Sequence, residues 1–196
     1  LVMIGRQFYT EGDFLEYVVV HETAHQWWYG LVGNNEIREP WLDEALTEFS
    51  TMLYYEHRYG PQHSKRIYDE FILTPYKLFE LTATPGPIHR SLTEFTRWSE
   101  YSAIVYCRGT IMLKGLEDII GKAKMQEALQ HYLNSNMYKN ATTSDFIEAV
   151  NHVTGENYKD YIYDELSSIQ PLVWLDDKSK TSVSDAKGII PENNGK

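Results

Sequence analysis

The chain has 196 residues, of which 42% are hydrophobic and 14% aromatic, a composition typical of a globular protein with one core of ordinary size. Its formal net charge of −10 argues against a nucleic-acid partner, because such partners need clustered lysine and arginine to displace their counterions. No apolar run approaches the roughly 18 residues that cross a bilayer, and the single cysteine excludes an internal disulfide.

The chain begins with a short apolar segment, residues 1–4, which predicts a strand that ends at Gly5. A start of this kind resembles the middle of a protein. We therefore expect a fragment of a larger protein that lacks N-terminal domains. Whether C-terminal domains are missing as well stays open. Nothing in the segment resembles a signal peptide, and the localisation stays open.

A buried helix is predicted next, from about residue 14 to residue 31, because this segment is apolar nearly all round. It contains a His-Glu-Thr-Ala-His run at 21–25. Residues four apart on a helix lie one above the other, so His21 and His25 can present two imidazoles to one metal ion. Glu22 lies one step round the same turn, beside the position that such a metal leaves open for water.

The surroundings of this run favour metal binding over the alternative, a solvated helix face on which two histidines occur four apart by chance. Residues 17–20 (Tyr-Val-Val-Val) and 26–29 (Gln-Trp-Trp-Tyr) would surround two imidazoles and a carboxylate with large apolar groups. Burial of such polar groups without partners costs several kcal/mol. Coordination to an ion removes that cost.

A second helix is expected from about residue 41 to residue 59, after a turn-rich stretch that ends at Pro40, a plausible first helical residue. Glu44 and Glu48 are four apart on this helix and share a face. We interpret Glu44 as the third metal ligand. We interpret Glu48 as a carboxylate that holds the imidazole of His21 by its other ring nitrogen. The alternative for Glu48 is an exposed helix carboxylate.

The rest of the chain predicts a mainly α protein. Helices are expected at about residues 62–81, 97–120, 124–134, 144–153 and 158–167, with a Thr-Pro-Gly-Pro loop at 84–87. Residues 176–196 are polar and lack periodicity, which is typical of a linker or a frayed tail. We therefore expect one domain over residues 1–170 and a linker or tail over residues 171–196.

Two motifs carry a resemblance to a known family. The His-Glu-x-x-His run, with a glutamate nineteen residues after its second histidine, is the zinc pattern of the gluzincin metallopeptidases. HETAHQWWYGLVG at 21–33 and WLDEALTEF at 41–49 resemble the zinc aminopeptidase family of aminopeptidase N and leukotriene hydrolase. The resemblance covers about residues 1–166. It implies a thermolysin-like (gluzincin) catalytic domain, here with a short N-terminal strand remnant, and one Zn²⁺ ion.

The family also has a Tyr-x-Lys-Gly element some sixty residues beyond the glutamate ligand, and its tyrosine stabilises the oxyanion of the tetrahedral intermediate. Tyr106-Cys107-Arg108-Gly109 occupies that place, with arginine in the lysine position. A phenol with a pKa near 10 stays protonated at neutral pH and can donate to developing negative charge. Because the chain has fifteen tyrosines, Tyr101 is kept as the alternative, and Cys107 is expected to be a packing residue.

The resemblance implies zinc-dependent peptide hydrolysis that releases N-terminal residues. In this interpretation His21, His25 and Glu44 hold the ion, Glu22 activates water, and Tyr106 shares the oxyanion with zinc. Peptides are the expected substrates. The family segment that binds the free amino terminus is not in this chain, so an endopeptidase, an epoxide hydrolase at the same zinc and a non-catalytic binding module stay open as alternatives.

Overall fold

The computed structural model describes residues 2–10 and 13–172, and most of that part of the chain is helical, as expected. The α-helices are α1 (Asp13–Ala24), α2 (Trp41–Tyr59), α3 (Pro61–Tyr68), α4 (Thr74–Glu80), α5 (Trp98–Tyr101), α6 (Gly109–Ile120), α7 (Lys122–Asn136), α8 (Thr143–Thr154) and α9 (Lys159–Ser167). The π-helical segments are η2 (Asp69–Leu73) and η4 (Ser102–Arg108), and two 3₁₀ turns are η1 (Arg6–Thr10) and η3 (Leu92–Glu94). None of the described helices is long and apolar enough to cross a membrane.

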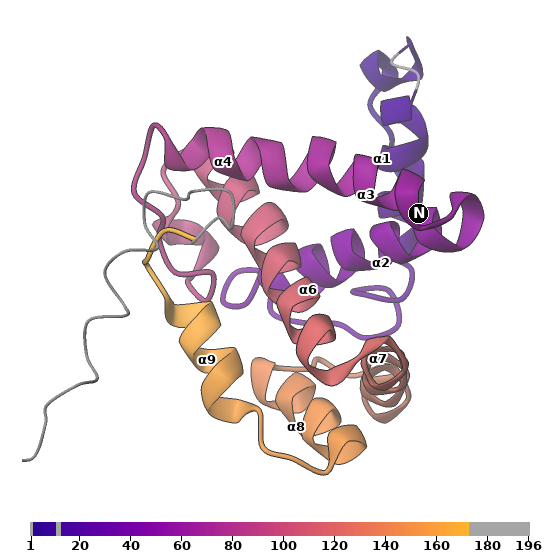
Figure 1. Cartoon of the computed structure of the whole chain (residues 1–196), viewed down its shortest axis with the longest axis vertical. Helices are drawn as coiled ribbons and strands as arrows, with labels where there is room; N and C mark the ends of the chain where they lie inside the picture. The colour runs from indigo at the N-terminus through magenta and orange to yellow at the C-terminus, as the bar shows by residue number, and fades with distance from the viewer. Residues whose placement is uncertain (1, 11–12, 173–196) are drawn as a thin grey trace, which may run out of the picture.

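Helix α2 lies at the centre of this arrangement, since α1, α3, α6 and η4 all pack against it. Figure 1 shows α3 and α4 along one side of the molecule and α7, α8 and α9 along the opposite side. Helix α2 begins at Trp41, as predicted, and Pro40 is its N-cap instead of its first helical residue. This central position sets the first turn of α2, and with it Glu44, against the end of α1.

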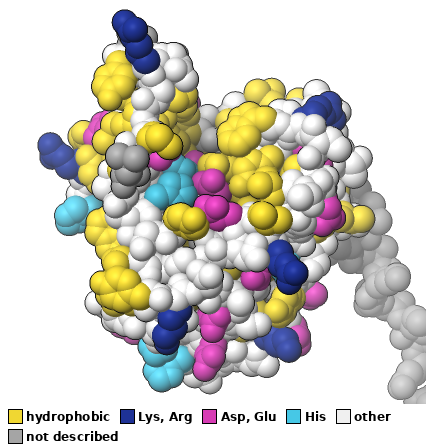
Figure 2. All heavy atoms as spheres, turned by 180° about the vertical axis from the view of Figure 1, so that it is seen from behind, with side chains coloured by type: hydrophobic (Ala, Val, Ile, Leu, Met, Phe, Trp, Pro, Cys, Tyr) yellow, Lys and Arg dark blue, Asp and Glu magenta, His cyan; other side chains and the backbone are white. Residues whose placement is uncertain are grey.

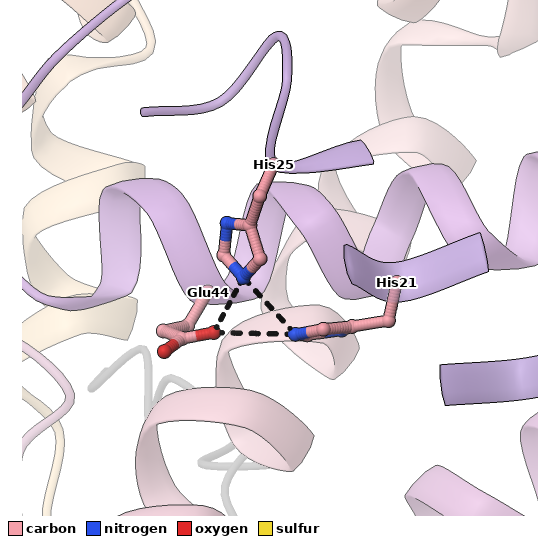
Figure 3. Close-up of side chains that lie close together, drawn as sticks. All are labelled: His21, His25 and Glu44. Carbon is pink, nitrogen blue, oxygen red and sulfur yellow. Dashed lines mark hydrogen bonds and ion pairs between the residues drawn. The ribbon is translucent and has the colours of Figure 1, made fainter. Parts of the chain in front are cut away.

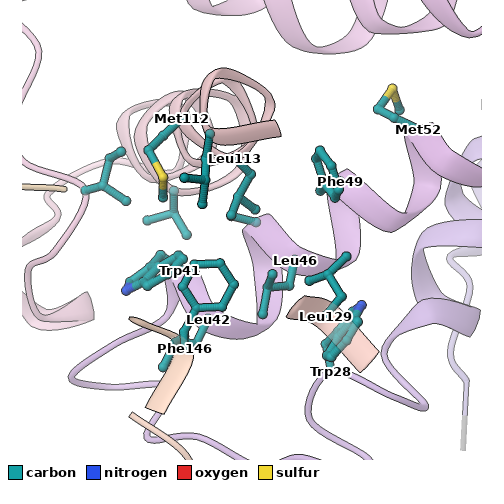
Figure 4. Close-up of a cluster of buried hydrophobic side chains, with 14 of the residues drawn as sticks. Trp28, Trp41, Leu42, Leu46, Phe49, Met52, Met112, Leu113, Leu129 and Phe146 are labelled. Carbon is teal, nitrogen blue, oxygen red and sulfur yellow. The ribbon is translucent and has the colours of Figure 1, made fainter. Parts of the chain in front are cut away.

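The core gathers around the buried face of α2 (Figure 4). Trp41 is fully buried, its ring meets Phe146 of α8 edge-on at 5.5 Å, and its Nε1 donates to Thr143 Oγ1 at 3.1 Å. Leu46 and Leu113 are also fully buried. Each such side chain contributes about 1.5–3 kcal/mol by leaving water, so this core holds α2 firmly between its neighbours.

A close approach between α2 and α6 depends on Gly109. A Cβ atom at this position would lie 2.6 Å from Ala45 Cβ, which is closer than real Cβ contacts come. The absence of a side chain therefore lets the start of α6 lie directly on α2. The preceding segment η4, which carries Tyr106, is brought against the same turn of α2 that carries Glu44.

The predicted helices at 62–81 and 97–120 are confirmed, but each contains a π-helical turn that the sequence analysis did not predict. In the first, the Thr74 N–H donates to the Asp69 carbonyl, five residues back, just before Pro75. Proline lacks an N–H, and a widened turn accommodates it within a continuous helix. In the second, η4 occupies residues 102–108.

Two expectations at the start of the chain are wrong. Residues 2–5 form no strand, and the described residues contain only isolated β-bridges, Trp28 with Val32 and Gly33 with Asn140, so no neighbouring strand satisfies the backbone of this segment. The helix predicted to reach residue 31 ends at Ala24. The chain reverses there, because Tyr29 has a φ of +100° and its N–H donates to the Val32 carbonyl at 2.8 Å.

Helix α1 is also less buried than its composition suggests, since Val19 is 38% exposed and Trp27, just beyond the helix, is 46% exposed. The three C-terminal helices α7, α8 and α9 were predicted to within about two residues, and Gly155 ends α8 in the left-handed conformation, with a φ of +74°. The tail predicted at 176–196 lies outside the described residues.

Candidate metal centre

Three predicted ligands meet where the end of α1 faces the first turn of α2 (Figure 3). The Nε2 atoms of His21 and His25 lie 3.1 Å apart. Glu44 Oε2 is 3.4 Å from His21 Nε2 and 3.2 Å from His25 Nε2. Among the described residues these three form the only group of histidine, cysteine and carboxylate side chains with the spacing of a metal site, and the other five histidines belong to no such group.

The donor atoms fit a divalent cation. Both imidazoles and the carboxylate direct one atom to a common point, and Glu44 Oε2 is buried there without accepting a directed hydrogen bond. A buried carboxylate oxygen without a donor is unfavourable, and a cation would supply the missing partner. Two imidazole nitrogens and one carboxylate oxygen are also a ligand set that catalytic zinc sites use.

The electrostatics of the group likewise favour positive charge at this point. Burial opposes protonation of His21, but the carboxylates of Glu48 and Glu44 outweigh it and raise the pKa of His21 to about 10. Burial alone would raise the pKa of Glu44, yet its contacts with His21, His25 and Tyr106 lower that pKa to about 2. Without a metal, protons therefore supply the positive charge that a cation would otherwise bring.

Each histidine has a second contact that orients its ring. His21 Nδ1 lies 3.4 Å from Glu48 Oε1, and Glu48 is only 5% exposed, so Glu48 is not a surface carboxylate. His25 Nδ1 lies 3.1 Å from the Trp28 carbonyl oxygen and 3.2 Å from Thr47 Oγ1. Contacts of this kind aim Nε2 at the metal position. The two partners of His25 were not predicted, because the first depends on the tight turn after α1.

Tyr106 reaches the same group from η4. Its hydroxyl donates to Glu44 Oε1, and its ring stacks on His21 with centroids 5.8 Å apart. Burial and the Glu44 carboxylate raise the pKa of Tyr106 far above its ordinary value, so the phenol remains a donor. The alternative, Tyr101, packs edge-on against the Tyr106 ring at 5.6 Å, and within the described residues it makes no hydrogen bond to the three ligands.

The remaining residues of the tyrosine motif do not touch the metal group. Arg108, in the lysine position of the family motif, is 2% exposed and donates to the carbonyl oxygens of Gly86 at 3.2 Å and Gln170 at 3.1 Å. It joins the proline-rich loop to the segment after α9. Cys107 is buried, as expected of a packing residue, with its Sγ 3.8 Å from the Phe71 carbonyl oxygen.

Glu22 follows His21 in α1 and is half-buried. Within the described part of the chain it takes part in no hydrogen bond or ion pair, in contrast to Glu44 and Glu48. Glu22 is thus one residue from a ligand and has no competing partner, and it stands outside both the group of three convergent side chains and the cavity lining.

A cavity of about 470 Å³ opens next to Glu44 and Tyr106. Most of its lining side chains are acidic or aromatic, and one is basic. The lining residues are Glu36, Asp43, Glu44, Leu92, Phe95, Thr96, Arg97, Trp98, Tyr101 and Tyr106. Figure 2 shows histidine and acidic side chains side by side on one face of the molecule, bordered by hydrophobic side chains. The metal group is thus accessible from a space large enough for part of a peptide.

Asp43 belongs to this cavity and is 4% exposed, with Oδ1 accepting from Asn34 Nδ2 at 2.8 Å. Burial, followed by the neighbouring Glu44 carboxylate, raises the pKa of Asp43 to about 7. Asp43 is not one of the three convergent residues.

The sequence is similar to those of known proteins. The family model Peptidase family M1 domain matches residues 8–167. The glutamyl aminopeptidase of Sus scrofa is 32% identical over 134 residues, which are 68% of this chain and 14% of that protein. Aminopeptidase M1-C of Oryza sativa subsp. japonica is 29% identical over 145 residues, covering 72% of this chain and 16% of that protein. The chain thus spans about one seventh of the length of these relatives.

Solved structures show the same fold. The M1 zinc metallopeptidase of Deinococcus radiodurans superposes with a TM-score of 0.64 at 19% identity, over 81% of this chain and 34% of that one. Aminopeptidase A of Legionella pneumophila, solved with aspartic acid, has a TM-score of 0.60 at 22% identity, over 78% of this chain and 16% of that one. The predicted thermolysin-like helical fold is therefore confirmed.

Proposed function

This chain belongs to peptidase family M1, and from that premise we propose that it carries the zinc centre of a metallopeptidase that releases N-terminal residues from peptides. The observation that carries the proposal is the convergence of His21, His25 and Glu44 on one point beside an open cavity. Residues 1–170 would be the catalytic region, and residues 171–196 a linker or tail.

His21, His25 and Glu44 would hold a single Zn²⁺. When bound, zinc would polarise the carbonyl of the scissile bond and lower the pKa of a water at its open position to about 7. Glu48 and the Trp28 carbonyl would hold the two imidazole rings so that Nε2 of each faces the ion. This arrangement requires both histidines to be deprotonated at Nε2.

Glu22 would act as the general base. Its position next to His21 and its lack of a competing partner leave its carboxylate able to take a proton from the attacking water. The same carboxylic acid would then protonate the leaving amine. A carboxylate serves both steps because it accepts the proton in the first and returns it in the second.

Tyr106 would donate a hydrogen bond to the negative charge that develops on the carbonyl oxygen of the substrate. Its hydroxyl lies in the same cavity as Glu44, and its raised pKa keeps the proton in place. The contact matters most in the transition state, because the ground-state carbonyl carries little charge.

We expect Tyr106→Phe to lower kcat by about 10²-fold, near 3 kcal/mol, while zinc content and substrate KM change little. The measurement is steady-state kinetics with elemental analysis of the same samples. Tyr101→Phe is the matched control, because it removes the hydroxyl of a neighbouring tyrosine that, among the described residues, makes no hydrogen bond to the ligands. If Tyr101→Phe is the damaging change, the tyrosine has been assigned wrongly.

The peptidase proposal is tested with paired substrates on the longest native form that contains this chain. We expect cleavage of peptides with a free amino terminus and little cleavage of the same peptides after N-acetylation, since a misplacement of about 1 Å can cost on the order of 10²-fold in rate. Equal cleavage of both would indicate an endopeptidase. Turnover of a lipid epoxide alone, or zinc binding without any turnover, would contradict the proposal.

A further inference from the structure

A second tyrosine, which is not part of the cavity lining, is connected to the metal centre through Glu48. Tyr17 is four residues before His21 in α1 and is 6% exposed. Its hydroxyl donates to Glu48 Oε2. The other oxygen of the same carboxylate, Oε1, lies 3.4 Å from His21 Nδ1. Tyr17 therefore contacts Glu48, and Glu48 contacts His21. Of these three residues only His21 belongs to the ligand group.

The aromatic packing around Tyr17 keeps its hydroxyl in place. Its ring lies 4.6 Å from that of Phe71 and stacks on Phe14 at 6.1 Å and on Tyr55 at 6.5 Å. Burial, together with the Glu48 carboxylate, raises the pKa of Tyr17 well above its ordinary value. The phenol therefore keeps its proton and acts as the donor in its contact with Glu48.

A glutamate side chain alone has enough rotamer freedom to leave a histidine ring poorly oriented. Here Glu48 Oε2 accepts a hydrogen bond from a packed aromatic side chain, and Oε1 lies within ion-pair distance of a metal ligand. Without the Tyr17 hydroxyl, Oε2 would lose its donor within a buried site, which is unfavourable for a charged acceptor. The carboxylate could then turn away from His21 to regain a partner.

We propose that Tyr17 is a positioning residue of the metal centre, whose hydroxyl fixes the Glu48 carboxylate so that Glu48 in turn fixes the imidazole of His21. This inference rests on the proposed function, because it treats His21 as a zinc ligand. It goes further by assigning a role to a tyrosine outside the motifs that identified the site. The competing explanation is that Tyr17 only fills the core.

Tyr17→Phe tests the inference, since it keeps the ring and removes only the hydroxyl. Removal of a residue that contacts a ligand directly costs about 10 to 100-fold in metal affinity, and we expect a smaller loss here, about 3 to 10-fold. Zinc affinity is measured by competition with a chromophoric chelator. Tyr76→Phe is the matched control, because Tyr76 is fully buried and lies on α4, where its ring packs against Phe79. It should leave zinc affinity unchanged.

A double-mutant cycle separates positioning from packing. In a Glu48→Ala background, Tyr17→Phe should cause no further loss of zinc affinity, because both changes break the same connection. An equal loss in both backgrounds would overturn the inference, as would unchanged zinc affinity in Tyr17→Phe with the native Glu48.

The contact can also be measured without zinc, which separates this inference from the proposed function. In ¹⁵N-histidine-labelled metal-free protein, the His21 Nδ1 proton should be shifted downfield and protected from exchange, and Tyr17→Phe should reduce both effects. An identical His21 signal in Tyr17→Phe would reject the inference even if zinc binds. Failure of the native chain to bind zinc, with the His21 signal altered by Tyr17→Phe, would instead reject the zinc assignment alone.

Discussion

His21→Ala should abolish zinc binding under conditions in which the native chain retains one ion. The structure directs three donor atoms to one point, and alanine leaves only His25 and Glu44 as ligands. Glu48 keeps its contact with Tyr17 but loses its contact with the imidazole. We expect a loss of affinity on the order of 10³-fold, or about 4 kcal/mol. The measurement is elemental analysis after gel filtration, supported by chelator competition.

Glu44→Gln is a second test of the ligand assignment, because it nearly preserves the volume of the side chain and removes its charge. It should also release the metal, while circular dichroism shows the helices intact. His57→Ala, at an exposed histidine outside the ligand group, should retain zinc in full. Full retention of zinc in His21→Ala or Glu44→Gln would contradict the ligand assignment.

Glu22→Gln should lose turnover and keep the metal. The amide cannot take a proton from water, and general-base removal typically costs about 10² to 10⁴-fold in rate. Because Glu22 is not one of the three convergent residues, the zinc content should equal that of the native protein. Kinetics and elemental analysis on the same preparation of the longest native form measure both quantities. Activity within a few-fold of the native value would rule out the proposed base.

The ligand set could be predicted from the sequence because its geometry is mostly local. His21 and His25 belong to one helix, and their spacing alone makes them neighbours. Glu44 required a second helix to fold back on the first, which the turn-rich stretch ending at Pro40 indicated. The contact between Glu48 and His21 followed from the one-turn spacing of Glu48 and Glu44 on α2.

Other parts of the site depend on contacts that no local pattern contains. The π-helical turn in η4 arises within a continuous helix, and nothing in the periodicity of residues 97–120 indicated it. The end of α1 was wrong because an apolar run favours helix, whereas the structure has a tight reversal at Tyr29. Burial of α1 was overestimated for a related reason, since composition does not say which neighbours cover Val19 and Trp27.

Tyr17 is the clearest example of this limit. On the sequence alone it is one of fifteen tyrosines, and it stands in an apolar run that is typical of core packing. Its contact with Glu48 spans 31 positions along the chain and depends on how α1 lies against α2. Such a contact can be identified only from a three-dimensional structure that gives the positions of both helices and of the aromatic rings around them.

The most direct test of the account is zinc K-edge X-ray absorption on the chain after it has been loaded with zinc and freed of excess metal. The account predicts one zinc per chain, bound by two imidazole nitrogens at about 2.0–2.1 Å and by oxygen atoms at about 2.0–2.2 Å. His21→Ala and His25→Ala should retain no zinc after the same loading and removal of excess metal. A chain that binds no zinc, or a zinc shell with fewer than two imidazoles, would contradict the assignment of His21, His25 and Glu44.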